Sequence, residues 1–156
     1  MIQVIAFEGL SPFIIPNPTY VKRGLLDKLD FMKCDVWRGR YISSGPQPKV
    51  RVSGETVTKF IVIGHSMGGP SAIDWCNRNA VQVDLLLTMD PRPLHQPYIK
   101  PANVKRAVNF YRGKRGFFDM QGYPVKGAEN IRVNCGHTEI PFLHLAQIVL
   151  DSHCDE

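Results

Sequence analysis

The sequence predicts a three-layer α/β/α sandwich, in which helices cover both faces of a mainly parallel, doubly wound sheet of about six strands. Apolar runs recur along the chain with polar, glycine- or proline-bearing segments between them, a pattern typical of alternating strands and helices. The runs also lack the period-two alternation of half-exposed strands, which indicates a parallel sheet buried on both faces. With 156 residues, the chain is expected to form a single domain, residues 1–156.

The first half of the chain alternates strands with one helix. Residues 2–7 are mostly apolar and predict a short buried strand. Residues 20–32 repeat apolar side chains at helical spacing just after a proline, so we expect a helix there. Residues 34–37 predict a second, shorter strand and residues 60–63 a strong buried one. Between them, residues 41–58 begin as a loop and end in a segment that fits a strand or a weak helix.

The second half continues the alternation. Residues 70–79 predict a helix, because a proline near a helix start loses no hydrogen bond. Residues 83–89 and 104–111 are apolar runs that predict strands, whereas 112–128 hold five glycines or prolines and predict a loop. The last strand and the last helix are expected at residues 128–134 and 141–151.

Composition narrows the classes of partner and cofactor. The four cysteines are widely spaced and form no C-x-x-C pair, so we expect no metal site and no cofactor. Free thiols are the favoured interpretation, with a Cys135–Cys154 disulfide left open. Six of the nineteen Lys and Arg residues lie between Lys100 and Arg115, and the net charge is +5. This basic stretch is suited to nucleic acid or an anionic surface, but a solvated face is favoured.

The N-terminus carries no sign of targeting. It has no basic region, no long apolar core and no small-residue cleavage site, so no secretory signal is expected. No apolar run approaches the roughly 18 residues that span a bilayer. We therefore expect a cytoplasmic protein without a membrane span.

A candidate nucleophile lies in Gly64-His65-Ser66-Met67-Gly68, between the predicted strand 60–63 and helix 70–79. A serine in a G-x-S-x-G turn that joins a strand to a helix is a nucleophile elbow, which raises its hydroxyl above the sheet edge. The Met67 amide at the helix N-terminus is the expected first oxyanion donor. The loop after the first strand should supply the second, and we name the Leu10 amide, although a plain turn fits that loop equally well.

A serine needs a histidine base oriented by a carboxylate, in the order serine, acid, histidine for this kind of elbow. Asp90 closes the strand 83–89, and His137 follows the strand 128–134. Both should therefore lie at the carboxyl edge of the sheet, where active sites of open α/β sheets gather. Asp84 and Asp74 are rivals at unsuitable positions, since one begins a strand and the other lies on a helix. The rival histidines are His65, expected to support the site by packing or hydrogen bonding, with His95, His144 and His153.

Together, Gly-His-Ser-Met-Gly-Gly, the strand-ending Asp90-Pro91 and Cys-Gly-His-Thr resemble the α/β-hydrolase family of lipases, esterases and thioesterases. The resemblance runs from residue 2 to about residue 150 and is closest to small bacterial members. Those often place an Asn-Val and an Asn-x-Tyr segment after Asp-Pro, where Asn103-Val104 and Asn109-Phe110-Tyr111 stand here. The resemblance implies Ser66, Asp90 and His137 as a triad. The sequence departs from the family in its shortness, which leaves no room for a large lid, and in Glu8-Gly9 in place of a usual His-Gly.

The expected activity is hydrolysis of a small carboxylic ester or thioester through an acyl-serine intermediate. Residues 100–115 carry the alternative, a non-catalytic module of the same fold that binds nucleic acid or an anionic surface. All three triad types in the proper order favour the enzyme. Neither the oligomeric state nor the identity of the acyl group follows from the sequence.

Overall fold

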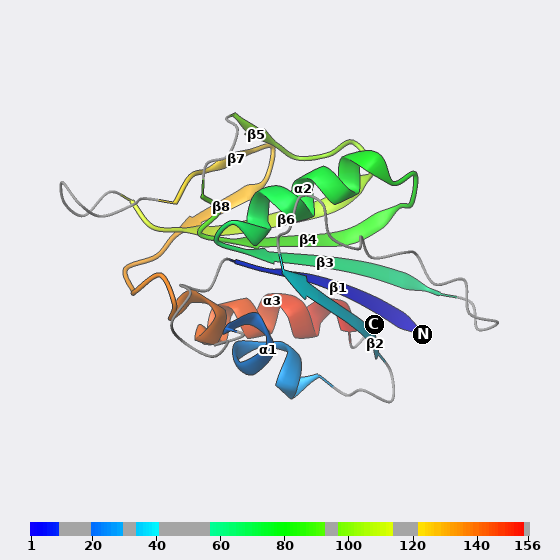
Figure 1. The fold of residues 1–156 in the computed structure, drawn as a ribbon, viewed down its shortest axis with the longest axis horizontal. Coiled ribbons are helices and arrows are strands. Elements are labelled where there is room, and N and C mark those ends of the chain that lie inside the picture. Colours follow the sequence, from blue (N-terminus) through cyan, green and yellow to red (C-terminus); the bar gives the residue numbers. More distant parts are fainter. Residues whose placement is uncertain (10–19, 30–33, 41–56, 93–96, 114–121, 155–156) are drawn as a thin grey trace.

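A computed structural model describes residues 1–9, 20–29, 34–40, 57–92, 97–113 and 122–154. Its main sheet has six strands in the order β2-β1-β3-β4-β6-β8, and all five pairings between neighbours are parallel (Figure 1). The strands are β1 (Ile2–Glu8), β2 (Cys34–Arg40), β3 (Lys59–His65), β4 (Val83–Met89), β6 (Val104–Tyr111) and β8 (Glu129–Arg132).

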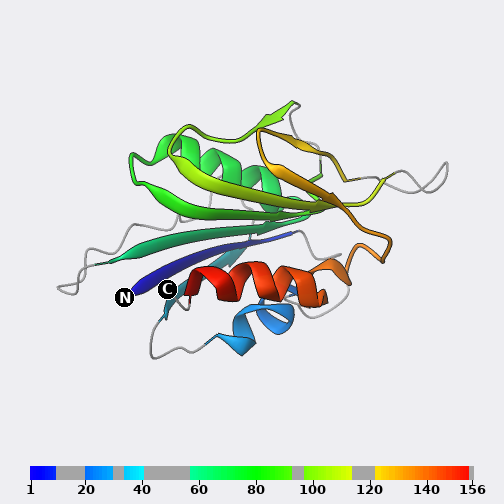
Figure 2. The ribbon, with the colours of Figure 1, turned by 180° about the vertical axis from the view of Figure 1, so that it is seen from behind.

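Helices cover both faces of this sheet. One face carries α2 (Gly68–Arg78), and the other carries α1 (Tyr20–Gly24) and α3 (His144–Cys154), as Figures 1 and 2 show from opposite sides. Two apolar clusters fill the spaces between the layers, one containing α2 side chains and the other side chains of α1 and α3. The parallel α/β architecture expected from the sequence is therefore confirmed.

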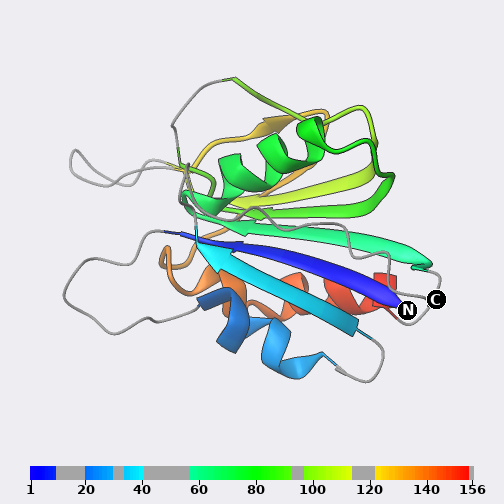
Figure 3. The same cartoon turned by 45° about the vertical axis from the view of Figure 1, so that its right-hand side comes forward.

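The carboxyl ends of the central strands are level with one another. His65 at the end of β3 is paired in register with Met89 at the end of β4, and Met89 is paired with Phe110 of β6. Figure 3 shows β2, β1 and β3 running in the same direction, so their ends also meet at this edge. The residues that follow these strands are consequently brought together.

The helices differ in extent from the sequence prediction. The first is a single turn, α1, followed by a 3-10 turn (Leu26–Lys28), instead of a helix through residue 32. Its end coincides with Gly24, where a Cβ atom would lie 2.4 Å from the carbonyl oxygen of Pro141. The last helix is divided into a 3-10 turn (Ile140–Phe142) and α3, because Leu143 takes an extended conformation between them.

A second, two-stranded sheet pairs β5 (Tyr98–Ile99) with β7 (Val125–Lys126). The sequence prediction of an irregular loop over residues 112–128 is wrong at β7. The undecided segment 41–56 lies outside the described residues. No helix among those described is long and apolar enough to cross a bilayer.

Candidate active site

Ser66 is the first residue beyond β3 and lies in the tight turn that leads into α2. Its φ of 57° is left-handed, a conformation that costs a non-glycine residue roughly 1–3 kcal/mol. Three backbone hydrogen bonds hold it there: its N–H donates to Met89 O (2.9 Å), and its carbonyl accepts from Gly69 N and Arg92 N (both 3.1 Å). The surrounding structure thus fixes a strained serine at the strand end, as a nucleophile elbow requires.

Two glycines let neighbouring backbone approach this turn. A Cβ on Gly68 would lie 2.1 Å from the carbonyl oxygen of Phe7, so only glycine allows α2 to begin beside β1. A Cβ on Gly9 would lie 2.7 Å from the Ser66 Cβ and 3.2 Å from its Oγ. The loop that follows β1 therefore begins directly against the candidate nucleophile.

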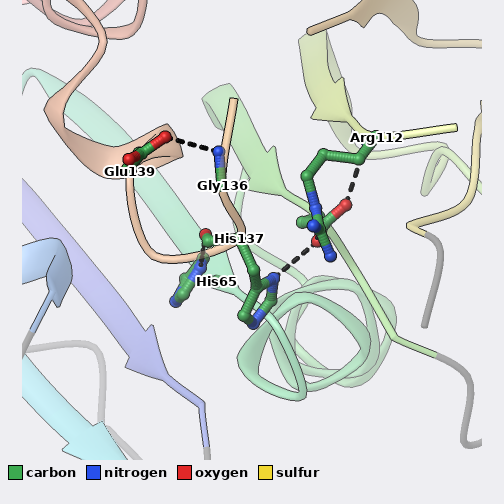
Figure 4. A network of polar contacts seen from close by, with 6 residues as sticks. His65, Arg112, Gly136, His137 and Glu139 are labelled. Carbon is green, nitrogen blue, oxygen red and sulfur yellow. Dashed lines mark hydrogen bonds and ion pairs between the residues drawn. The ribbon is translucent and has the colours of Figure 1, made fainter. Parts of the chain in front are cut away.

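Asp90 is the first residue beyond β4 and is fully buried. It also has a left-handed φ, of 48°, and its N–H donates to Phe110 O at 2.7 Å. Its Oδ2 lies 2.5 Å from Nδ1 of His137, 47 residues further along the chain (Figure 4). Because the carboxylate only accepts, the imidazole carries its proton on Nδ1. Nε2 is then the ring nitrogen left to act as a base.

Arg112, the first residue beyond β6, binds the same carboxylate twice. Its backbone N–H donates to Oδ1 of Asp90 at 3.0 Å, and its Nε donates to Oδ2 at 2.9 Å. Both side chains are buried. Burial by itself raises the pKa of Asp90, but hydrogen bonds from His137 and Arg112 outweigh it, and the pKa lies below its usual value. Asp90 is therefore an ionised carboxylate without contact with water.

His137 lies in a closed turn after β8. Two hydrogen bonds between Glu139 and Gly136 close this turn. The Glu139 carboxylate accepts from Gly136 N (2.5 Å; Figure 4), and the Glu139 N–H donates to Gly136 O (3.1 Å). The His137 side chain is about one fifth exposed, at 21%. It is thus held by its neighbours on one side and open to an incoming molecule on the other.

His65 supports His137 from beneath. Its Nε2 lies 3.0 Å from the carbonyl oxygen of His137, and the two rings stack with centroids 4.6 Å apart. Burial, followed by the nearness of His137, lowers the pKa of His65 to about 3. His65 is therefore neutral and donates its Nε2 proton to the carbonyl, in agreement with the supporting role expected of it.

The structure brings Ser66, Asp90 and His137 to one edge of the sheet, but it records no hydrogen bond between Ser66 and His137 among the described residues. Such bonds often tighten only when substrate binds. Met67 is the N-cap residue of α2, and its N–H has no hydrogen-bond partner within the described residues, so it is available to an oxyanion. Leu10, the second predicted donor, lies outside those residues.

The rival residues lie elsewhere. Asp84, at the amino-terminal end of β4, accepts from Phe60 N (2.8 Å) and pairs with Lys105 (2.6 Å). Asp74 pairs with Arg78 on the surface of α2. The two histidines of α3 take no part in the Asp90 contacts, and His95 lies outside the described residues.

Arg112 is the residue that sequence reasoning missed as part of the site. The predicted strand 104–111 ended directly before it, so it stood at the same edge as Ser66 and Asp90. An arginine after a strand has no distinctive spacing, so the sequence alone does not separate Arg112 from the basic stretch of residues 100–115.

The basic stretch does not form a free positive surface in the described part of the chain. Lys105 pairs with Asp84, and Arg106 pairs with Glu129 at 2.8 Å. Lys100 donates to the carbonyl oxygens of residues 101 and 104, and Arg112 is buried in the site. Residues 114 and 115 lie outside the described ranges.

No disulfide joins any of the four cysteines. Within the described ranges, no three His, Cys, Asp or Glu side chains are grouped so as to hold a metal ion. In comparisons with family models, curated proteins and solved structures, this chain matches none.

Proposed function

We propose that this chain is a serine hydrolase of the α/β-hydrolase kind, which cleaves a carboxylic ester or thioester through an acyl-Ser66 intermediate. The observation that carries the proposal is the Asp90–His137 hydrogen bond of 2.5 Å, formed at the sheet edge that also holds the strained Ser66. A buried carboxylate that fixes a histidine tautomer beside a raised serine is the arrangement used for acyl transfer.

In the first half-reaction, the Ser66 Oγ forms a bond to the substrate carbonyl carbon while His137 Nε2 accepts the hydroxyl proton. Asp90 holds the imidazole by Nδ1 and stabilises the imidazolium. The tetrahedral intermediate then breaks the carbon–oxygen or carbon–sulfur bond, and His137 delivers the proton to the departing alkoxide or thiolate. The products are an alcohol or thiol and acyl-Ser66.

In the second half-reaction, water attacks the acyl carbon and gives a proton to His137, which returns it to Ser66 Oγ as the carboxylic acid leaves. In both halves negative charge develops on the carbonyl oxygen. The Met67 N–H at the start of α2 is the proposed donor to this oxyanion, with the amide of Leu10 as the second. The close approach of Gly9 to Ser66 supports a donor from the loop after β1.

The test is covalent labelling with a fluorophosphonate probe. Wild-type protein should be labelled, whereas Ser66→Ala should not. Ser152→Ala, which removes an exposed serine of α3, is the matched control and should be labelled like wild type. A folded wild type that stays unlabelled would refute the proposal.

A series of p-nitrophenyl esters and acyl thioesters of rising chain length then defines the substrate. We expect short or exposed acyl groups to react fastest. Two aromatic side chains near the sheet edge, Phe110 and Tyr98, are buried and so present little surface to a long acyl chain. A rate that rises steadily to long chains would contradict a short acyl group.

A further inference from the structure

Three neighbouring strands of the sheet, β3, β4 and β6, are each followed directly by a residue of the candidate site. Ser66 follows β3, Asp90 follows β4 and Arg112 follows β6. The triad accounts for two of them. Arg112 is a fully charged, buried residue at the third strand end, and the proposed reaction assigns it no step.

Arg112 and His137 use the same oxygen of Asp90. Oδ2 accepts from Arg112 Nε at 2.9 Å and from His137 Nδ1 at 2.5 Å, while Oδ1 accepts the Arg112 backbone N–H at 3.0 Å. Three donors therefore fix the plane of the carboxylate. The negative charge that would stabilise an imidazolium at His137 is also shared with a permanent cation.

Gly122 lies directly against the Arg112–Asp90 contact. Gly122 N donates to Arg112 O at 3.2 Å, and a Cβ on Gly122 would meet Asp90 Oδ1. In this water-poor setting electrostatic interactions are stronger than at the surface. Arg112 consequently acts on Asp90 with little screening.

We propose that Arg112 is a positioning residue of the triad, which orients Asp90 for His137 and lowers the pH at which His137 becomes an active base. The inference rests on the proposed hydrolase function. The cation competes with the imidazolium for one carboxylate, so it favours the neutral, proton-accepting form of His137. The ionisable groups around His137 come from the ends of three strands, β3, β4 and β6, and from its own turn: His65, Asp90, Arg92, Arg112 and Glu139.

The test compares two variants that separate charge from shape. Arg112→Gln removes the charge, and Arg112→Lys keeps it but loses the fixed geometry of the Nε donor. Arg106→Gln is the matched control, because Arg106 lies on the same strand and pairs with Glu129 at the surface. Each protein is labelled with the fluorophosphonate probe from pH 4 to pH 9, after its folding has been checked by thermal melting.

In Arg112→Gln the acidic limb of the pH–rate profile should move upward by roughly one pH unit, as expected on losing a neighbouring charge. In Arg112→Lys the limb should stay near that of wild type while the maximal rate falls about three- to ten-fold. The control should match wild type in both respects. If both Arg112 variants react more slowly but the acidic limb of their pH–rate profiles stays at the wild-type pH, the proposal is overturned. A purely structural role of Arg112 predicts that result.

A second measurement does not depend on activity. NMR follows the His137 ring signal against pH in Ser66→Ala and in Ser66→Ala with Arg112→Gln. The titration midpoint should be higher in the double variant, and equal midpoints would overturn the inference. If wild type is never labelled but the midpoints differ, the hydrolase proposal fails while the action of Arg112 on His137 stands. If Arg112→Gln does not fold, Arg112→Lys provides the test. An acidic limb that moves to higher pH in Arg112→Lys, although the charge is retained, would contradict the proposal.

Discussion

At the scale of single residues, backbone strain marks the candidate site. Ser66 and Asp90 are the non-glycine residues with left-handed φ in the described part of the chain. Both directly follow a buried strand and both are held by backbone hydrogen bonds. Strain of this kind persists where the surroundings over-determine it, and it gathers at functional sites.

Asp90→Asn should abolish most activity without unfolding the protein. An Asn amide can donate to Nδ1 and so favours the tautomer whose Nε2 carries a proton, which cannot act as a base. We expect kcat to fall by about 10⁴-fold, measured with the best p-nitrophenyl ester. Asp84→Asn is the matched control at the other end of β4, and its kcat should stay near the wild-type value. A small effect of Asp90→Asn would remove Asp90 from the triad.

Gly9→Ala should disable Ser66 by contact alone. The new methyl group would lie 2.7 Å from the Ser66 Cβ and 3.2 Å from its Oγ, so one of the two backbones must shift. We expect fluorophosphonate labelling to slow by at least about ten-fold, because small displacements of reacting groups are costly. Gly113→Ala is the comparison, since its methyl group would meet only the end of the exposed Arg132 side chain. Equal labelling of the two variants would contradict the placement of the loop after β1.

The three residues of the proposed triad could be chosen from the sequence because each follows a recognisable strand end. The sequence did not predict the link between Arg112 and Asp90, because that contact depends on which strands are neighbours. The order β3-β4-β6 places the two residues side by side, and no local pattern encodes that order.

At the scale of elements, strands were predicted better than helices. The bounds of β4 and β6 match the predicted ranges 83–89 and 104–111, because both strands are mainly apolar segments that are followed directly by a charged residue. The first helix was predicted too long, since its end depends on the contact of Gly24 with Pro141, far away in sequence. The pair β5–β7 was missed because strands of two residues leave no periodic signal.

A buried polar cluster joins these elements and should be important for stability. Thr88 Oγ1 donates to Asn109 Oδ1 at 2.8 Å, and Asn109 Nδ2 donates to Tyr123 O and Asn130 Oδ1. Asn109→Ala leaves the buried Thr88 hydroxyl without its acceptor and removes both hydrogen bonds that Asn109 Nδ2 donates, so we expect a loss of about 2–4 kcal/mol in the free energy of unfolding. Urea denaturation measures it, with Asn77→Ala on the exposed face of α2 as control. A loss below about 0.5 kcal/mol would show that the cluster contributes little.

At the scale of the whole molecule, the candidate site lies at the topological switch point of the sheet, where the strand order changes direction. β1 is flanked by β2 and β3, and the helices that follow β1 and β3 cover opposite faces of the sheet. Open α/β sheets bind ligands in the crevice at such a point. The fold class followed from the sequence because burial patterns report it, whereas the strand order followed only from the structure.

Acid should destabilise the whole protein through His65. Its pKa is about 3 when folded and 6.5 when unfolded, so the unfolded chain binds more protons between these values. The contribution of His65 to the free energy of unfolding is therefore complete above pH 6.5 and declines as the pH falls toward 3. The pKa of Asp90 is also lowered, so protonation of Asp90 adds a further loss of stability below its usual pKa of 3.8.

From pH 7 to pH 4.5 we expect wild type to lose about 2–3 kcal/mol of unfolding free energy through His65, measured by urea denaturation. His65→Gln should lose correspondingly less over the same interval, whatever its stability at pH 7. His144→Gln, at an exposed position of α3, should behave as wild type. Equal losses in wild type and His65→Gln would show that His65 does not drive the acid response.

The attachment of Ser66, Asp90 and Arg112 directly to strand ends has a consequence for how this chain tolerates change. Insertions or deletions in the connections between strands leave these three positions where they are. A single deletion inside β4 would instead move Asp90 by one residue and turn alternate side chains to the opposite face. Variation in length should therefore be confined to the loops, which can diversify while the three residues at the strand ends stay fixed.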